Sequence, residues 1–211
     1  MSPKSIMKAL IIANGSLPAG SVIRKLLPSC DIIVCADGGA NQARKLHITP
    51  DIILGDMDSI TKSTRTYFSR IPLLVVKDQN STDLEKAITY CIRQEIKCAD
   101  VIGALGGRID HSTGSLGCFP KFRHDIHLRM FDSDGVVTLI DRSIKFKSKK
   151  GRKISLIPLE RCNGITTRNL KYELKNGVLE LGVREGISNE ATSSNVSIEV
   201  RKGTLLLYLF S

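Results

Sequence analysis

The strongest constraint on the fold is the alternation of wholly apolar runs with helical patterns over the first two thirds of this 211-residue chain. Strands that are apolar throughout and separated by helices are typical of a parallel sheet covered on both faces. The expected strands cover residues 7–13, 32–36, 73–76, 101–105 and 126–131. The expected helices cover residues 17–27, 39–46, 59–69, 82–95 and 110–122. The sequence therefore predicts an α/β domain with a mainly parallel sheet.

The last third of the chain changes character, because the helical pattern stops near Val136. Short strands are expected at residues 136–140, 144–146, 154–159, 165–174, 178–183, 196–200 and 204–210. Asn176-Gly177 and Lys202-Gly203 are typical hairpin turn sequences. This spacing predicts a small antiparallel β-sandwich or barrel, and we take the sandwich as the expected fold. We expect residues 1–142 to form the α/β domain and residues 143–211 the all-β domain.

The formal net charge of +10 raises the question of a polyanionic partner. Its densest stretch, residues 145–153, precedes an apolar strand and is typical of a solvated turn between strands. The chain has no tryptophan, and few aromatic residues interleave with its cations, which disfavours stacking on single-stranded nucleic acid. We expect no nucleic-acid partner.

Cysteine spacing and hydropathy bear on the compartment. None of the 6 cysteines forms a C-x-x-C pair, and most lie within apolar runs, where free cysteine packs as a small core residue. The longest apolar runs, such as residues 205–210, are too short to span a bilayer. We therefore expect a cytoplasmic protein with reduced thiols and no membrane partner.

Polar clusters follow several of the expected strands or short apolar runs. They begin at Asn14, Asp37, Gly55, Asp78 and Gly103. Ligands of parallel sheets bind beyond the carboxyl ends of the strands, where such clusters meet. The sequence therefore predicts one site at this edge of the sheet.

The motif Gly55-Asp56-Met57-Asp58-Ser59 presents two carboxylates that point the same way in an extended loop. Magnesium prefers a few carboxylates together with water and phosphate oxygens. Asp58 could instead be the N-cap of a helix that begins at Ser59, with Asp56 merely solvated.

A second polar cluster surrounds the start of the helix expected at residues 82–95. Thr82 and Glu85 have capping-box spacing, which places Asp83 in the first turn, where the helix dipole favours negative charge. Gln79 lies just upstream and has no such structural explanation. A helix start with this many polar groups suits a phosphate or a metal as well as a cap.

The third cluster contains Gly106, Gly107, Arg108, Asp110 and His111. Glycines let backbone N–H groups approach phosphate oxygens, and the guanidinium fork suits a phosphate partner. The aspartate could hold magnesium or accept a proton from an attacking hydroxyl, or could simply cap a helix. The histidine is expected at a helix start.

Two weaker features complete the set. Asn14 begins a turn, and Asp37, Gly38 and Asn41 lie at a helix start that two glycines also open to a nucleotide. Four carboxylates, those of residues 56, 58, 83 and 110, repel one another in a small volume unless a cation neutralises them. Magnesium-dependent transfer from a nucleotide is the simplest chemistry for this set.

With these motifs in place, the chain resembles the thiamin pyrophosphokinases. The matching segments are residues 35–41, 50–60, 78–83, 106–111, 165–172 and 186–190, in the family's order and over nearly the whole chain. The resemblance implies an ATP-binding α/β domain, a β-sandwich domain, and a homodimer with thiamin near the subunit interface. It also implies attack of the thiamin hydroxyl on the β-phosphorus of ATP, giving thiamin diphosphate and AMP.

The resemblance carries roles to matching positions. Asp56, Asp58 and Asp83 are then the Mg²⁺ ligands, and Arg108 neutralises phosphate charge while Asp110 activates or orients the hydroxyl. The nucleotide-contacting or substrate-contacting positions are Asn14, Asp37, Gly38, Asn41, Gln79, Thr82, Gly106, Gly107 and His111. The thiamin-side positions are Ser188, Asn189 and Tyr172.

Departures from the family pattern concern the acceptor pocket. Many relatives have an aromatic residue at Met57, and some have tryptophan at the position of Tyr172. A pyrophosphokinase for another hydroxyalkyl heterocycle, such as a pterin, is therefore an alternative. A non-catalytic nucleotide- or RNA-binding protein is a further one, although clustered carboxylates do not favour a nucleic-acid surface.

Overall fold

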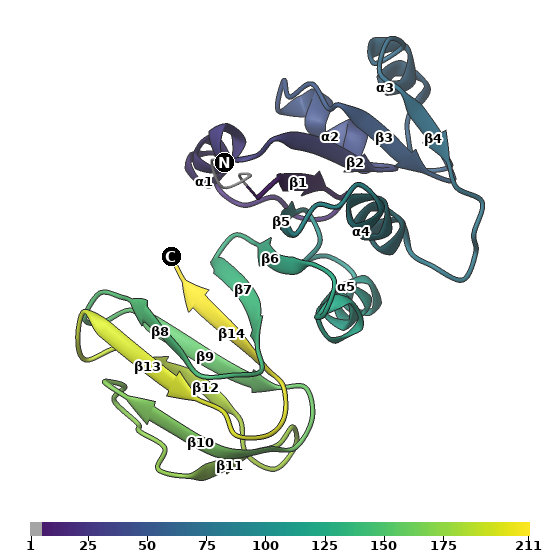
Figure 1. Ribbon diagram of the computed structural model, residues 1–211. Helices are drawn as coiled ribbons and strands as arrows, with labels where there is room; N and C mark the ends of the chain where they lie inside the picture. Colours follow the sequence, from purple (N-terminus) through teal and green to yellow (C-terminus); the bar gives the residue numbers. More distant parts are fainter. Residues whose placement is uncertain (1–5) are drawn as a thin grey trace, which may run out of the picture. The chain divides into compact units, whose positions relative to one another are not determined.

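The computed structural model describes residues 6–211, which form two compact units that meet in sequence between Ser133 and Asp134 (Figure 1). The first unit contains every α-helix that the structure describes, and the second is built of strands. No helix within residues 6–211 is long and apolar enough to cross a membrane.

The first unit alternates strands and helices. In chain order these are β1 Lys8–Ile12, α1 Gly20–Leu26, the short 3₁₀ turn Leu27–Ser29, β2 Ile32–Ala36, α2 Gly39–Lys45, β3 Ile52–Gly55, α3 Lys62–Tyr67, β4 Leu73–Val75, α4 Asp83–Arg93, β5 Cys98–Ile102, α5 Ile109–Phe122 and β6 His127–Phe131. The strands lie in the order β6–β5–β1–β2–β3–β4, and all of these neighbours are parallel. The predicted parallel α/β sheet is confirmed.

The core of this unit lies on both faces of the sheet. Leu10, Ile12 and Ile53 are fully inaccessible and pack with α1 and α2, whereas α4 buries Ala87, Ile88 and Cys91. Each fully buried Leu or Ile side chain contributes roughly 1.5–3 kcal/mol of transfer free energy. The buried face of α4 therefore anchors this helix, and with it the residues at its N-terminus.

Two strands of this unit differ from the sequence expectation. Strand β3 was not among the expected strands. The strand expected at residues 101–105 instead ends at Ile102. It ends there because Gly103 has φ +72°, and a Cβ at this position would lie 2.3 Å from the Ala13 carbonyl oxygen. Only glycine allows the chain to turn so close to the loop after β1.

The second unit consists of two antiparallel sheets, as predicted. Its strands are β7 Gly135–Ile140, β8 Ile144–Lys147, β9 Lys153–Pro158, β10 Cys162–Arg168, β11 Gly177–Leu179, β12 Gly186–Glu190, β13 Asn195–Glu199 and β14 Leu205–Phe210. One sheet has the order β12–β9–β14–β7 and the other β11–β10–β13–β8. Ile154, Leu156, Ile165, Ile198 and Leu205 form part of the core between them.

Three details of the second unit differ from expectation. Lys202-Gly203 does not form a hairpin, because it connects β13 to β14, which belong to different sheets. Strand β12 was not predicted. The first strand, β7, pairs with β14 from Gly135 opposite Phe210 to Ile140 opposite Leu205, so its residues lie in this unit and not in the preceding one.

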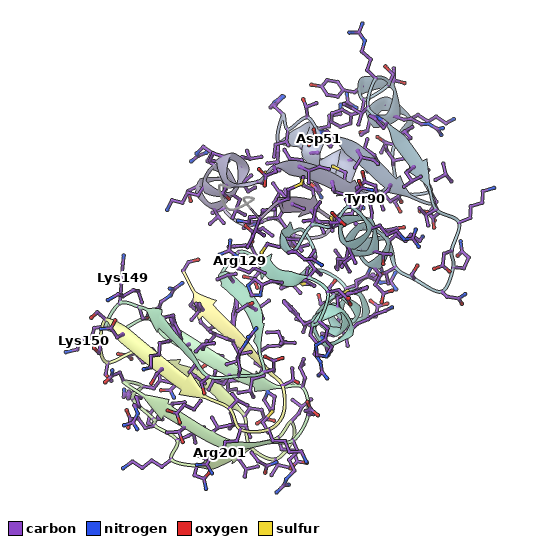
Figure 2. The ribbon with its side chains drawn as sticks, in the orientation of Figure 1. Asp51, Tyr90, Arg129, Lys149, Lys150 and Arg201 are labelled. Atoms are coloured by element: carbon purple, nitrogen blue, oxygen red, sulfur yellow. The ribbon has the colours of Figure 1, made fainter. Side chains whose placement is uncertain are left out.

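The basic segment at residues 145–153 includes β8 and the turn that joins it to β9 in the other sheet. Lys149 and Lys150 are exposed at this turn, and Figure 2 shows their side chains extending away from the strands. The segment is thus a solvated turn, although it links two sheets and is not a hairpin.

Candidate functional site

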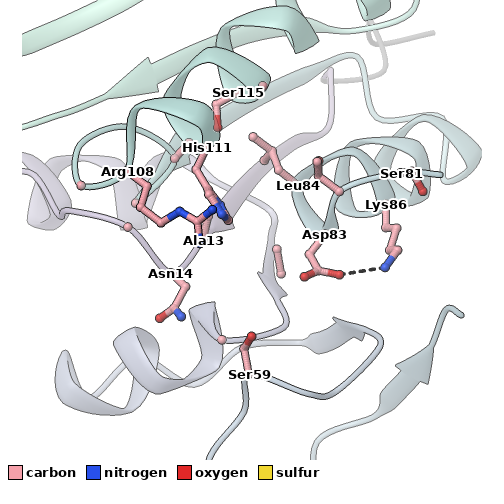
Figure 3. A pocket seen from close by; sticks show the side chains of 18 of the residues that line it. Ala13, Asn14, Ser59, Ser81, Asp83, Leu84, Lys86, Arg108, His111 and Ser115 are labelled. Atoms are coloured by element: carbon pink, nitrogen blue, oxygen red, sulfur yellow. Dashed lines mark hydrogen bonds and ion pairs between the residues drawn. The ribbon is translucent and has the colours of Figure 1, made fainter. Parts of the chain in front are cut away.

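Four polar loops of the first unit meet at one edge of the sheet, because they follow four adjacent parallel strands. Asn14 follows β1, Asp37 follows β2, Asp56 follows β3, and the loop from Gly103 to Arg108 follows β5. They surround a cavity of about 670 Å³, which the N-terminal parts of α4 and α5 also line (Figure 3). The cavity is large enough for a nucleotide-sized ligand.

Most of the predicted nucleotide and catalytic residues line this cavity. These are Asn14, Gly38, Asp56, Gln79, Thr82, Asp83, Gly106, Gly107, Arg108, Asp110 and His111. Asp37, Asp58 and Asn41 are not part of the lining. The cavity thus lies at the edge of the sheet where the sequence predicts a site, and whether these residues act there stays a prediction.

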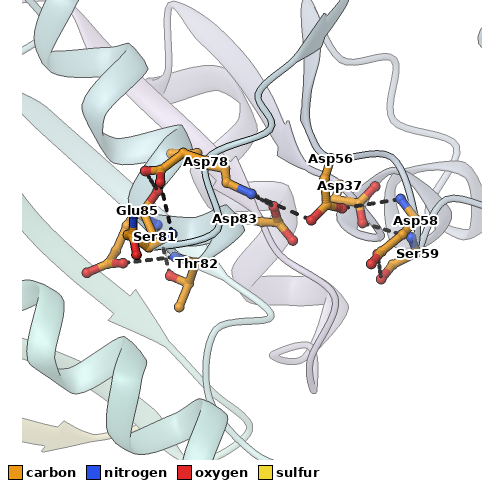
Figure 4. A network of polar contacts seen from close by, with 11 residues as sticks. Asp37, Asp56, Asp58, Ser59, Asp78, Ser81, Thr82, Asp83 and Glu85 are labelled. Carbon is orange, nitrogen blue, oxygen red and sulfur yellow. Dashed lines mark hydrogen bonds and ion pairs between the residues drawn. The ribbon is translucent and has the colours of Figure 1, made fainter.

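Three carboxylates form the tightest acidic group in the part of the chain that the structure describes. Asp37, Asp56 and Asp58 each offer an oxygen, and these oxygens all lie within 4.8 Å of one another (Figure 4). Gly55 permits this approach: its φ is +152°, and a Cβ here would lie 2.6 Å from Cβ of Asp37. Asp83, the third expected metal ligand, lies outside the group.

Asp37 is the most deeply buried member of this acidic group, with only 1% of its surface exposed. Its Oδ2 accepts a hydrogen bond of 2.9 Å from the backbone amide of Ser59. Its Oδ1 is buried and has no hydrogen-bond partner among the described residues. Burial raises the pKa of this carboxyl, and the charges of Asp83 and Asp58 act in the same direction. An unpaired buried carboxylate oxygen beside two further carboxylates fits a hard divalent cation, which prefers such ligands.

The loop that carries Asp56 and Asp58 is not a helix cap. Helix α3 begins at Lys62, and its N-cap is Thr61, whose side chain accepts a hydrogen bond from the Thr64 amide. This excludes the capping role considered for Asp58. The Asp58 carboxylate instead accepts a hydrogen bond of 2.8 Å from the Ser59 hydroxyl, which lowers its pKa.

The loops after β2 and β3, which carry the acidic group, also contain strained backbone. Asp37 and Met57 have φ values of +38° and +70°, in the region that residues with a Cβ rarely adopt. Such strain concentrates at ligand-binding and catalytic sites, where the surrounding structure enforces it. Asn41 contributes to that enforcement: its side chain donates to the Ser59 carbonyl and accepts from the Thr61 amide. Asn41 thus holds the loop and does not face the cavity.

The start of α4 has the predicted capping box. The Thr82 hydroxyl accepts from the Glu85 amide, and the Glu85 carboxylate accepts from the Thr82 amide. Asp83 follows in the first turn, and its Oδ1 accepts a hydrogen bond of 3.0 Å from the ammonium group of Lys86. The same ammonium lies 3.7 Å from Oδ2 of Asp56. Asp83 is therefore tied to the acidic group through a lysine.

Sequence reasoning missed Lys86 and did not identify Asp37 as part of the acidic group. Residues three apart lie on the same face of a helix, so the sequence could have predicted the ion pair between Asp83 and Lys86. For Asp37, the signal was its position directly after β2, which neighbours β3 in the sheet. That adjacency follows from the strand order, which the sequence did not supply.

Arg108 and Asp110 form an ion pair and both line the cavity. Figure 3 shows Arg108 across the cavity from Asp83 and Lys86 of α4. Arg108 is the N-cap position of α5, so Asp110 is not the cap that was considered. The guanidinium of Arg108 holds the pKa of Asp110 down at about 2, and the His111 amide, which donates to the same carboxylate, acts in the same direction. A carboxylate with so low a pKa is a poor proton acceptor at neutral pH.

The expected acceptor residues all lie in the second unit. Asn189 is buried, and its side chain both accepts from the Tyr172 amide and donates to the Tyr172 carbonyl. Tyr172 itself is 65% exposed, with the Lys171 ammonium over its ring. Ser188 is exposed and has φ +56°. Asn189 therefore fixes the backbone that presents Tyr172, and the ring is not a core residue.

Comparison with known families matches both units. The model described as "Thiamin pyrophosphokinase, catalytic domain" matches residues 23–130. The model described as "Thiamin pyrophosphokinase, vitamin B1 binding domain" matches residues 141–205. The two matches follow one another in the order of the two units.

Individual relatives agree with these matches. The chain is 32% identical to "Thiamin pyrophosphokinase 1" of Caenorhabditis elegans, over 79% of this chain and 74% of the relative. It is 28% identical to "Thiamine pyrophosphokinase 1" of Arabidopsis thaliana, over 90% of this chain and 82% of the relative. The solved structure of thiamin pyrophosphokinase from Candida albicans shares the fold, with a TM-score of 0.88 at 19% identity, over 100% of this chain and 94% of that one.

Proposed function

The chain belongs to the thiamin pyrophosphokinase family, and from this premise we infer that it transfers the pyrophosphoryl group of ATP to the hydroxyl of thiamin. The products are thiamin diphosphate and AMP. The observation that carries this inference is the ordered match of both family models, one to each unit of the chain. The polar cavity at the sheet edge supports it, because the family's catalytic-domain match covers most of the residues that form this edge.

The transfer makes one bond and breaks another. The thiamin hydroxyl oxygen attacks the β-phosphorus of ATP, the bond from that phosphorus to the α,β-bridging oxygen breaks, and AMP leaves. The hydroxyl proton is lost to solvent or to a nearby base. Little covalent chemistry falls to the protein, so positioning and charge neutralisation account for most of the catalysis.

We assign Asp37, Asp56 and Asp58 to hold Mg²⁺, with Asp83 positioned beside them by Lys86. A bound Mg²⁺ would neutralise phosphate charge and align the β-phosphorus. The unpaired Oδ1 of Asp37 supports the inclusion of this residue, which the sequence did not assign to the metal.

Arg108 and Asp110 act as a pair in this proposal. The guanidinium of Arg108 contacts phosphate oxygens as negative charge develops on them. Asp110 orients Arg108 and the acceptor hydroxyl, because its pKa of about 2 makes it a weak base. Asn14, Gly38, Gln79, Thr82, Gly106, Gly107 and His111 supply the remaining nucleotide-facing surface of the cavity.

The acceptor side is assigned to the second unit. Tyr172 offers an exposed ring for stacking on a heteroaromatic ring of thiamin, and Ser188 offers a hydroxyl, while Asn189 holds their loops together. The proposal includes a homodimer with thiamin near the subunit interface. The exposed apolar side chains of Val183 and Ile187 in this unit support it.

The proposal also places the protein in the cytoplasm. Its free cysteines at positions 30, 35, 91, 98, 118 and 162 support a reducing compartment. Burial raises the pKa of the Cys35, Cys91 and Cys118 thiols to about 12, so these thiols are unreactive core groups.

The decisive test is the nucleotide product. Purified protein is incubated with ATP, Mg²⁺ and thiamin, and chromatography separates AMP from ADP. We expect AMP and thiamin diphosphate in equal amounts; ADP, or no turnover with thiamin while a pterin alcohol reacts, would contradict the proposal. Asp56→Asn should lose activity, whereas the control Asp125→Asn, outside the cavity lining, should retain it.

A further inference from the structure

Lys86 is a buried lysine in the wall of the cavity. It lies on α4, and only 7% of its surface is exposed. Its ammonium group lies 3.0 Å from the Asp83 carboxylate (Figure 3) and 3.7 Å from the Asp56 carboxylate. Burying an ammonium group is costly unless it is paired, so the two carboxylates are what allow Lys86 to be buried here. The proposed function uses Lys86 only to place Asp83 and assigns no role to its charge.

The charge around Lys86 is strongly unbalanced. Asp37, Asp56, Asp58 and Asp83 carry four carboxylates. Among residues 6–211, Lys86 is the only lysine or arginine that forms an ion pair with any of these four carboxylates. The other strong cation of the cavity lining, Arg108, is paired with Asp110. Lys86 is therefore the group that offsets the negative charge of the acidic site.

We propose that Lys86 is a positioning residue that orients Asp56 and Asp83 and weakens the site's affinity for a free divalent cation. This inference rests on the proposed metal site. The fixed positive charge repels a second cation held by the same carboxylates. ATP supplies phosphate oxygens, which give the ammonium group another anionic partner and offset that repulsion. The cation therefore binds tightly only together with the nucleotide.

The size of the effect follows from Coulomb repulsion over one side-chain contact. For unit charges about 5 Å apart near a protein surface, loss of the lysine charge strengthens free-cation binding by at least about tenfold. Loss of the Asp56 and Asp83 orientation acts in the opposite direction. The direction in which cation affinity changes therefore separates the two roles. Tighter binding without the lysine charge shows that Lys86 weakens cation binding, and weaker binding shows that it only holds the carboxylates in place.

The experiment measures Mn²⁺ binding to the nucleotide-free protein from the electron paramagnetic resonance signal of the free ion. Mn²⁺ takes the same hard oxygen ligands as Mg²⁺. The variants are Lys86→Met and Lys86→Gln, which remove the charge, and Lys86→Arg, which keeps it. The matched control is Lys121→Met, because Lys121 pairs with Glu85 of the same helix without contacting the acidic group.

We expect the Mn²⁺ dissociation constant to fall about tenfold in Lys86→Met and Lys86→Gln and to stay within twofold of wild type in Lys86→Arg and Lys121→Met. An ATP analogue with a methylene bridge between the α- and β-phosphorus atoms should tighten Mn²⁺ binding strongly in wild type. In the two neutral variants that tightening should be about tenfold smaller.

Unchanged or weaker Mn²⁺ binding in the neutral variants would overturn the inference, as would equal strengthening in Lys121→Met. Thermal melts identify any variant that does not fold, and either neutral variant alone decides the sign. A wild-type protein that forms AMP and thiamin diphosphate while Lys86→Gln binds Mn²⁺ no more tightly would leave the proposed function standing and remove only this role.

Discussion

Asp37→Asn should make the protein more stable and less active at the same time. The carboxylate is 1% exposed, its Oδ1 lacks a partner among the described residues, and it adjoins two further carboxylates. Asparagine has the same shape, keeps an oxygen for the Ser59 amide, and tolerates the φ of +38°. The substitution therefore removes a charge without removing the hydrogen bond or straining the backbone.

The expected gain can be estimated from the orphaned oxygen. A buried polar group without a partner costs about 1–3 kcal/mol, and more when it is charged. Asparagine is neutral, so the substitution removes a buried, unpaired charge beside two carboxylates, and the free energy of unfolding should rise by about 1–3 kcal/mol in the absence of metal. In a chain of this size each 1 kcal/mol shifts the melting temperature by roughly 2–4 °C.

The assay is a thermal melt in EDTA, paired with steady-state kinetics in Mg²⁺. We expect a higher melting temperature for Asp37→Asn and a kcat/KM at least about 100-fold lower, because the proposed Mg²⁺ site loses a ligand. Asp51→Asn is the control, since the exposed Asp51 carboxylate also accepts one backbone amide, from Ile33, but adjoins no acidic group. A folded Asp37→Asn that melts below wild type in EDTA would refute the reasoning.

Three further predictions concern helices α4 and α5, whose N-terminal parts line the cavity. Gly114→Ala and Gly117→Ala should each stabilise α5 by up to about 1 kcal/mol, since an added Cβ meets nothing within 4 Å. Only Gly114 lines the cavity, so steady-state kinetics should show a higher KM for one substrate in Gly114→Ala alone. Thr82→Ala should lower the free energy of unfolding by about 1 kcal/mol in urea denaturation, because the capping box is lost. By carbon-detected NMR, Asp110 should stay ionised at pH 3.5, since its pKa is lowered to about 2 and its ionised form is lost only as the pH falls through that value. In Arg108→Gln its pKa should return toward 3.8, and an unchanged titration would show that the guanidinium is not the cause.

The hydropathy pattern predicted strands whose residues are nearly all buried, and it missed a strand whose residues are mostly exposed. Strands β1 and β2 are buried along most of their length, so their sequences contain continuous apolar runs. Strand β12, Gly186–Glu190, could not be found in this way, because Ile187 and Ser188 are exposed and only Asn189 is buried. Its pairing with β9 is a tertiary contact that leaves no periodic signal in the sequence.

The composition of the site required one fact beyond the motifs, namely the order of the strands. Asp56 and Asp58 were identified together because they are adjacent in sequence, and Asp83 because it begins a recognisable helix. Asp37 lies 19 residues before Asp56 and joins the acidic group only because β2 pairs with β3. The same topology explains why Asp83 is not among the closest carboxylates: it is fixed by α4, whose next turn supplies Lys86 to separate it from Asp56. Loop motifs thus predict which edge of a parallel sheet gathers polar side chains, whereas strand order decides which of those side chains lie together.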